Sequence, residues 1–307
     1  MVYGFLIVLL LAACGESEHA QPGKAGTGSP VAARPLLVAS NYPLFYFAGE
    51  IAGESEDAAQ IVLPEIEGDP AFWAPSAEQI QLLQSADLVL LNGAGFESWL
   101  DWVTLDRDRL LDTSAGLTDK LIELEDMAAH QHGPEGEHSH PGIAFTSWLD
   151  PRLAMEQAAA VAAALESLAP DQSERFRNNL AALQSKLSDL DRELEDTFAA
   201  LGDRPILFSH PVYQYLQRRY GLNGVSLHWE PDAEPSASAW IEFQKILQQH
   251  PAAIMLWEEE PLSSTATRLS ELGVRSIVFP TASNRPGQGD YFDVFYGVNM
   301  NLSLLLE

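Results

Sequence analysis

The segment from residue 171 to residue 201 constrains the fold of this chain more than any other. Its apolar residues recur three and four positions apart, the spacing of one face of an α-helix; they are Phe176, Leu180, Leu183, Leu187, Leu190, Leu194 and Phe198. A helix of about 30 residues is about 45 Å long, which exceeds one small lobe. We therefore expect it to cross the whole molecule and join two lobes. A coiled-coil arm is the alternative, disfavoured because strand patterns resume directly after it.

Strand and helix patterns alternate on both sides of this segment. Short apolar runs predict strands at 36–39, 60–63, 87–91, 205–209, 225–227, 252–257 and 274–279. Helical patterns are predicted at 42–51, 96–102, 151–168, 212–220 and 291–306. Two further helices are predicted from their first residues: one after a capping box of Ser76 and Gln79, and one after an N-cap at Ser263 or Ser264. This alternation is typical of parallel sheets with helices on both faces. The 307 residues suffice for two lobes, which we place at 36–168 and 203–307, with the linking helix at 169–202.

Two histidines stand where predicted strands end. His210 follows the strand at 205–209, and His228 follows the strand at 225–227, with Glu230 two residues further on. In open α/β sheets, ligands bind beyond the carboxyl ends of the strands. These side chains are therefore candidate ligands, although a histidine at this place also serves as a helix cap or hydrogen-bonded side chain.

Residues 129–142 hold four of the eight histidines, namely His130, His132, His138 and His140. Their glycines and prolines predict an exposed loop without regular structure. Histidine-rich tracts are typical of metal binding, here to Zn²⁺ or a similar borderline ion. The loop lacks cysteine and fixed spacing, so we interpret it as an auxiliary metal-capture segment and not as a closed structural site. A polar loop without function is the alternative.

The amino-terminal segment predicts export and a lipid anchor. Residues 1–13 are apolar and end in Leu11-Ala12-Ala13-Cys14, which resembles a bacterial lipobox that would leave Cys14 lipidated. The run is too short to span a bilayer, and no Lys or Arg precedes it. We interpret 1–13 as a signal peptide and 14–35 as a flexible tether, which predicts a membrane-anchored protein of the periplasm or cell surface. A chance cysteine after an apolar leader is the alternative.

The charge excludes one class of partner. The formal net charge of −27 argues against nucleic acid, because phosphates attract clustered Lys and Arg. An acidic protein attracts small cations, although solubility alone explains the charge.

Several motifs, in order, resemble the solute-binding lipoproteins of zinc and manganese ABC transporters. They are VASNYPLFYFAGEIAGE, IVLPEIEGDPAFWAPSAEQI, SADLVLLNGAGFESWLD, TSWLDP, SHPVYQYLQRRYGL and DAEPSASAW, together with the histidine-rich loop. The resemblance implies two α/β lobes joined by one long helix, as in helical-backbone periplasmic binding proteins. It also implies a monomer that holds a metal ion in the cleft between the lobes and delivers it to an ABC transporter permease.

The family's ligand positions are mostly altered in this chain. By the resemblance, His210 is the one inherited ligand, whereas Ala71, Thr146 and Phe279 stand where the family has two histidines and often a carboxylate. A lone imidazole cannot hold Zn²⁺ tightly, because zinc sites take three or four protein ligands. We therefore predict a rebuilt site of His210, His228 and Glu230. The acidic run Glu258 to Glu260, after the strand at 252–257, offers further candidates, with Glu260 as an auxiliary ligand. The cargo of the site is a divalent ion, zinc before manganese.

Three other functions are compatible with the sequence. The first is a metal chelate or small organic ligand in a cleft lined by aromatic residues, namely Tyr42, Phe72, Trp73, Trp148, Trp229 and Trp257. The second is an accessory metal-handling protein. The third is a hydrolytic enzyme using His210 beside the acidic run. The sequence has no Gly-x-Ser-x-Gly, phosphate-loop or HExxH motif, so we expect binding without catalysis.

Overall fold

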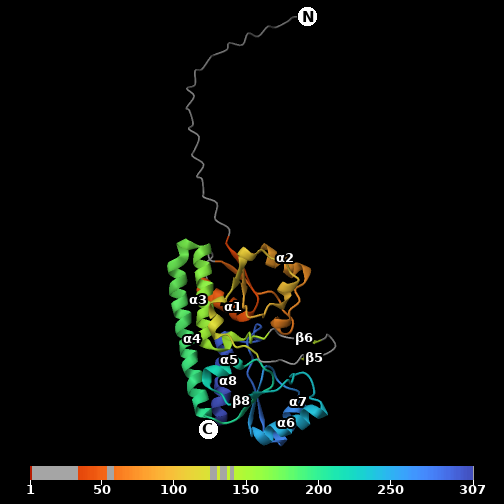
Figure 1. Ribbon diagram of the computed structural model, residues 1–307. Coiled ribbons are helices and arrows are strands. Elements are labelled where there is room, and N and C mark those ends of the chain that lie inside the picture. Colours follow the sequence, from red (N-terminus) through yellow and green to blue (C-terminus); the bar gives the residue numbers. More distant parts are fainter. Residues whose placement is uncertain (2–33, 54–58, 125–129, 132–136, 139–141, 307) are drawn as a thin grey trace. The chain divides into compact units, whose positions relative to one another are not determined.

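The structure is a computed structural model that describes residues 1, 34–53, 59–124, 130–131, 137–138 and 142–306 (Figure 1). The chain divides into residues 1–33 and a compact unit of residues 34–307. The predicted signal peptide, Cys14 and nearly all of the tether lie outside the described residues, as do His132 and His140. Within the described ranges, the helices are all too short or too polar to cross a membrane.

The first sheet is parallel and four-stranded. Its order is β2 (Gln60–Val62), β1 (Leu36–Ala39), β3 (Leu88–Leu91) and β4 (Leu110–Asp112). Side chains alternate between its faces, so Leu37 and Leu90 join the main core under α1 (Tyr42–Ala52), whereas Val38 and Val89 pack beneath α2 (Ala77–Ser85). The capping box of Ser76 and Gln79 is confirmed at the start of α2.

The second sheet repeats this arrangement. Its order is β10 (Arg275–Val278), β9 (Ile254–Trp257), β7 (Ile206–Phe208) and β8 (Gly224–Ser226), again all parallel. The main core on one face includes residues of α5 (Gln214–Tyr220) and α8 (Tyr291–Leu306). The opposite face is covered by α6 (Ala237–Gln249) and α7 (Ser263–Glu271). When the strands of each sheet are numbered in chain order, both sheets have the same spatial order: second, first, third and fourth strand.

The predicted long helix is confirmed as α4 (Ser173–Leu201). It packs along α3 (Pro151–Leu168) and contacts α1 beside the first sheet and α5 and α8 beside the second (Figure 1). Of its predicted apolar face, all members but Leu180 are fully buried in the main core, and Leu180 packs against that core. The predicted fold class is therefore confirmed, with two helix-flanked parallel sheets and one long helix.

Short 3₁₀ helices complete the unit: η1 (Pro70–Phe72), η2 (Ser98–Asp101), η3 (Arg107–Arg109), η4 (Ala115–Lys120), η6 (Ser147–Leu149) and η7 (Pro170–Gln172). The helix predicted at 96–102 is wrong, because only the single turn of η2 forms there. The chain before it makes a sharp turn with positive φ angles at Gly93, Ala94 and Gly95. Phe96 and Trp99 are buried in two different hydrophobic clusters.

Two further predictions are wrong in detail. Neither Ser263 nor Ser264 caps α7, because Leu262 holds the N-cap position and the Ser264 hydroxyl donates to Glu234. The histidine-rich segment is not wholly irregular, because β5 (His130–Gln131) pairs antiparallel with β6 (Glu137–His138). Glycine and proline between two short runs are compatible with a hairpin.

Candidate metal centre

The topology of the second sheet places the candidate site. In a sheet with this strand order, the connections leave in opposite directions from the first and third strands, and ligands bind at the carboxyl ends of that pair. Here the pair is β7 and β9. His210 follows β7, and the parallel pairing of Phe208 with Leu256 is extended by a hydrogen bond from the Ser209 N–H to the Leu256 carbonyl. His210 therefore lies at the carboxyl ends of this strand pair, the point at which the direction of the connections switches.

The structure brings the three predicted ligands together. His210 Nδ1 lies 3.5 Å from Glu230 Oε1. The His210 and His228 rings are 5.9 Å apart at their centroids and nearly perpendicular. Two donors that are each about 2.1 Å from one tetrahedral zinc ion lie about 3.4 Å apart. The separation of His210 and Glu230 is that of a direct ion pair, and it is also compatible with two ligands of one ion.

A small pocket adjoins His210. It is lined on the side of the first sheet by Asp69, Phe72, Phe145 and Thr146, and on the side of the second sheet by His210, Pro211, Val212 and Gln214, with Leu124 and Ala144. Its volume is about 30 Å³. Pockets for organic ligands usually measure several hundred Å³. The pocket therefore suits an ion with a few water molecules and not an organic molecule or chelate.

Negative charge accumulates around Glu258, just after β9. Burial and the charges of Asp69, Glu230 and Glu259 together raise the pKa of its carboxyl to about 8. A carboxyl in such surroundings gains a proton or a cation readily. Glu258 belongs to the acidic run in which the sequence predicts candidate ligands. Glu260, the auxiliary ligand predicted from that run, is exposed two residues further along the chain.

The three altered family positions have other contacts. The Ala71 N–H donates to Asp69 Oδ1 at 2.9 Å, so Asp69 caps η1. The Thr146 hydroxyl donates to the Val212 carbonyl at 2.5 Å, which ties the loop before η6 to the residues after His210. Phe279 is fully buried, with its ring against Tyr213 and Phe295. Of the three, Thr146 alone lines the pocket.

The predicted donors lie near one another but do not form a complete metal site. Among the residues that the structure describes, no group of three or more His, Cys, Asp or Glu side chains is arranged to hold a metal ion. In the histidine-rich segment, the β5–β6 register sets His130 directly opposite His138, while His132 and His140 lie outside the described residues.

The aromatic cleft predicted for the alternative ligand is wrong. Tyr42, Trp73, Trp148, Trp229 and Trp257 are all at most 6% exposed. The Trp148 indole donates to the Thr281 carbonyl at 2.7 Å, and Trp229 packs against Trp240 of α6. These rings form core because large apolar surfaces gain most from burial. Phe72 is the one member of that set that lines the pocket, and it is 43% exposed.

Comparison with known proteins places these features in a family. The sequence model of "Zinc-uptake complex component A periplasmic" matches residues 37–302. The zinc-binding lipoprotein AdcA of Streptococcus pneumoniae is 28% identical over 283 residues, which are 89% of this chain and 53% of AdcA. The high-affinity zinc uptake system protein ZnuA of Bacillus subtilis is 28% identical over 281 residues, which are 89% of this chain and 85% of ZnuA. The chain thus spans about half the length of its AdcA relatives.

Solved structures share the fold. The Zn(II)-bound ZnuA-like domain of Streptococcus pneumoniae AdcA superposes with a TM-score of 0.72 at 24% identity, over 88% of this chain and 98% of that one. The metal-dependent lipoprotein YcdH of Bacillus subtilis gives a TM-score of 0.72 at 24% identity, over 89% and 98% of the two chains. At this identity the likeness establishes the fold alone.

Proposed function

Because the chain belongs to the family of the zinc-uptake complex component A, we propose that it is an extracytoplasmic solute-binding protein of a metal ABC uptake system. It binds a divalent metal ion, zinc before manganese, and hands the ion to a transporter permease. Its relatives, the zinc-binding lipoprotein AdcA and the high-affinity zinc uptake system protein ZnuA, support this cargo. The work is binding and handover by a monomer, without catalysis.

One observation carries the proposal. The separation of 3.5 Å between His210 Nδ1 and Glu230 Oε1 is compatible with two ligands of one ion, beside a pocket too small for an organic cargo. His228 is the second imidazole of this site. It is exposed, so its ring can turn towards an arriving ion without leaving a packed core. An imidazole pair with a carboxylate is a suitable set for a first-row metal.

The remaining predictions complete the proposal. Residues 1–13 direct export, Cys14 carries a lipid anchor, and residues 14–35 tether the binding unit to a membrane in the periplasm or at the cell surface. The binding unit consists of lobes at 36–168 and 203–307, joined by residues 169–202. The histidines at 130, 132, 138 and 140, with Glu260, collect metal loosely and raise its concentration near the pocket. An accessory metal-handling role for the same site is the second candidate.

Calorimetric titration of the metal-free protein with Zn²⁺ and Mn²⁺ tests the function. We expect one site tighter than about 1 μM for Zn²⁺, by the usual conversion of affinity to free energy. The double variant His210→Ala, His228→Ala should lose this site, because one carboxylate cannot hold the ion. Deletion of residues 129–142 should keep it.

His250→Ala is the matched control, because His250 lies in the same half of the chain and its ring pairs with the Ile206 carbonyl. It should bind Zn²⁺ as the unaltered protein does. Failure of the intact protein to bind Zn²⁺ more tightly than micromolar would refute the metal-binding function. Loss of the tight site on deletion of residues 129–142, with the double variant unaffected, would place binding in the histidine-rich segment.

A further inference from the structure

Residues 281–290, which we call the strap, connect β10 to α8 and contact elements that belong to the first sheet. The Thr281 carbonyl accepts from the Trp148 indole of η6 at 2.7 Å. The Ser283 carbonyl accepts from the N–H of Tyr42, the first residue of α1, at 2.9 Å. The strap begins and ends beside the second sheet, so its backbone joins the two sheets.

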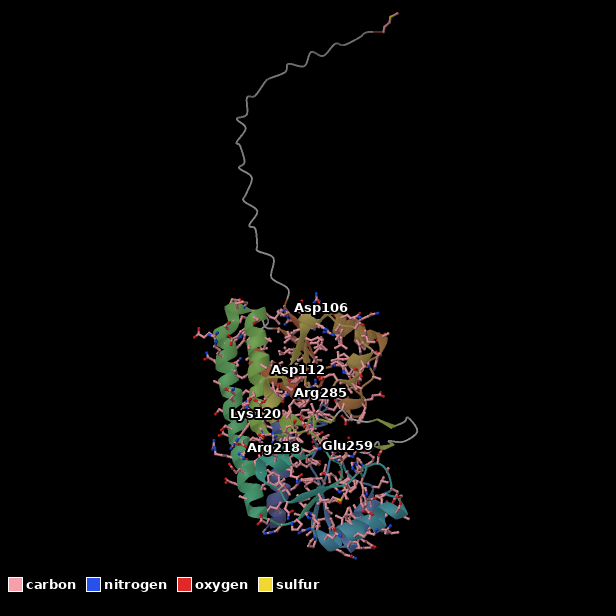
Figure 2. All side chains as sticks on the ribbon, viewed as in Figure 1. Asp106, Asp112, Lys120, Arg218, Glu259 and Arg285 are labelled. Atoms are coloured by element: carbon pink, nitrogen blue, oxygen red, sulfur yellow. The ribbon has the colours of Figure 1, made fainter. Side chains whose placement is uncertain are left out.

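Two side chains of the strap also bind α1. The Arg285 guanidinium lies 4.6 Å from the centroid of the Phe45 ring, in the region between the two sheets (Figure 2). The Asp290 carboxylate accepts from the Tyr46 hydroxyl at 2.9 Å. A cation over an aromatic face and a hydrogen bond to a carboxylate are both attractive. The strap therefore contacts α1 near its middle and at its end.

Both ends of the strap are fixed. At its start, Ala282 is 5% exposed and has a φ of +56°, a conformation that residues other than glycine keep only where the surrounding contacts hold them. At its end, the Asp290 carboxylate accepts from the Phe292 N–H at 2.8 Å, and the Asp290 N–H donates to Asp293 Oδ2 at 3.0 Å. This reciprocal pair caps the start of α8. Fixed ends hold the middle of the strap against the first sheet.

Asn284, in the middle of the strap, binds the loop that follows β2. Its Nδ2 donates to the Ile66 carbonyl at 2.8 Å and to the Gly68 carbonyl at 3.2 Å. Its Oδ1 accepts from the Arg285 N–H at 2.8 Å. Because both ends of the amide are hydrogen-bonded, its orientation is defined.

The loop that Asn284 binds forms one wall of the pocket. Asp69 follows Gly68 directly and lines the pocket together with His210. Gly68 and Asp69 are exposed, so packing alone does not fix this part of the loop. A pocket of about 30 Å³ holds about one or two water molecules, so a small outward shift of the wall opens it to solvent.

We propose that Asn284 is a positioning residue of the pocket. Through the carbonyls of Ile66 and Gly68 it holds the wall at Asp69 in place and slows the departure of a bound ion. The effect on the ion rests on the proposed function, whereas the link between the strap and the first sheet does not.

The first experiment measures how fast zinc leaves. Protein loaded with Zn²⁺ is mixed with an excess of a chromogenic chelator in a stopped-flow instrument. Asn284→Ala should release zinc roughly 3- to 30-fold faster, the factor that corresponds to the loss of one or two hydrogen bonds between uncharged groups. Asn223→Ala is the matched control, because Asn223 Nδ2 also donates to a backbone carbonyl, that of Asp203 at 3.0 Å, away from the strap. Its release rate should change less than about twofold.

Urea unfolding of the metal-free proteins separates positioning from stability. Both alanine variants lose one asparagine, so a general loss of stability would act on both release rates alike. Asn284→Asp keeps the size of the side chain but replaces the donor by an acceptor, so it should release zinc at least as fast as Asn284→Ala. Should these variants fail to fold, Arg285→Ala removes the contact with Phe45 from an exposed side chain and should also speed the release.

The second experiment tests the strap without metal. Spin labels at Arg107→Cys and Glu271→Cys, two exposed positions beside the first and second sheets, report the distance between the two sides by pulsed electron paramagnetic resonance. Cys14→Ser removes the native thiol. In the metal-free protein, Asn284→Ala should broaden the distribution of distances towards longer values, whereas Asn223→Ala should leave it unchanged.

The outcomes distinguish this inference from the proposed function. Tight Zn²⁺ binding with equal release rates in Asn284→Ala and the unaltered protein would overturn the positioning role and leave the proposed function standing. An unchanged distribution of distances in Asn284→Ala would overturn the strap. Absence of tight Zn²⁺ binding by the unaltered protein would overturn the proposed function and the effect on the ion, and a broadened distribution would still support the strap.

Discussion

At the scale of single residues, Glu97 is the most unusual group outside the candidate metal centre. Its buried carboxylate accepts from the Ser40 hydroxyl and the Asn92 N–H, both at 2.6 Å, and from the Gly93 N–H at 3.0 Å. The Asn92 amide in turn donates to the Phe145 carbonyl at 2.9 Å. Glu97 therefore ties the ends of β1 and β3 to a residue that lines the pocket, and it belongs to the scaffold of the site.

Glu97 should make stability depend on pH. Burial raises its pKa to about 7, although its three hydrogen bonds act in the opposite direction. A raised pKa in the folded state means that the folded protein binds more protons than the unfolded chain between about pH 4.5 and pH 7, so stability falls as pH rises through this range. We expect Glu97 to contribute a loss of up to roughly 3 kcal/mol between pH 5 and pH 8. Urea unfolding of the metal-free protein at both values measures it.

The raised pKa of Glu258 also makes stability fall with rising pH, but it does so equally in the unaltered protein and in Glu97→Gln. Comparison of these two proteins therefore isolates the contribution of Glu97. The variant should show a smaller difference between pH 5 and pH 8. It should also be less stable at both, by about 1–3 kcal/mol, because a glutamine nitrogen cannot accept the Gly93 N–H. An equal pH dependence in both proteins would contradict the assignment.

At the scale of elements, the turn after β3 depends on Gly93. Its φ is +79°, and a Cβ there would stand 1.9 Å from Asp112 Oδ1 and 2.2 Å from Ser114 Oγ. Those two side chains are hydrogen-bonded to each other at 2.8 Å, so neither is free to yield. We expect Gly93→Ala to lower the free energy of unfolding by more than about 2 kcal/mol, from backbone strain and overpacking together.

Ala94→Gly is the control for that turn. Ala94 already has a φ of +55°, which glycine adopts without strain, so the replacement should be neutral or stabilising by up to about 1 kcal/mol. Chemical denaturation of the three proteins measures both effects. Equal stability of Gly93→Ala and the unaltered protein would mean that the turn can rearrange.

The elements also show where sequence patterns are informative. The long helix, the capping box of α2 and the buried strands were predictable, because periodicity and capping residues act within a few positions of the chain. The pattern of α6 was present too, since Ser236 caps it and Trp240 and Phe243 share its buried face, but it was not recognised. By contrast, β4 has only three residues and depends on pairing with β3, a contact that no local pattern encodes.

The candidate site was predictable only in part, for the same reason. His210, His228 and Glu230 were found because each follows an apolar run that reads as a strand. Within the acidic run Glu258 to Glu260, the sequence could not distinguish the partly buried Glu258 from the exposed Glu259 and Glu260, because burial depends on how the end of β9 packs. The buried tryptophans were assigned to the cleft because their distance from the core cannot be read from sequence.

At the scale of the whole molecule, a charged cluster around Asp191 joins α4 to α3 and α5. Asp191 of α4 accepts two hydrogen bonds from Arg219 of α5, both at 2.7 Å, one from Arg152 of α3 at 3.1 Å and one from the Tyr220 hydroxyl at 3.1 Å. Burial alone would raise the pKa of Asp191, but the hydrogen bonds from the two arginines outweigh it and lower that pKa. The cluster therefore stabilises the protein above the usual pKa of an aspartate, and this contribution is lost as pH falls through the lowered value.

Removing both partners of this cluster should cost less than the sum of the two single losses. The Arg219 side chain is 8% exposed, so Asp191→Asn leaves a nearly buried guanidinium with only the more exposed Glu195 as its carboxylate partner, at a cost of about 2–4 kcal/mol. The double variant Asp191→Asn, Arg219→Met should be more stable than the sum of the single losses predicts, because the unpaired charge is gone. Asp189→Asn, which breaks the exposed pair with Arg192, should cost less than about 1 kcal/mol. Urea unfolding of the four variants gives the coupling energy, and strict additivity would show that Asp191 and Arg219 are not coupled in stability.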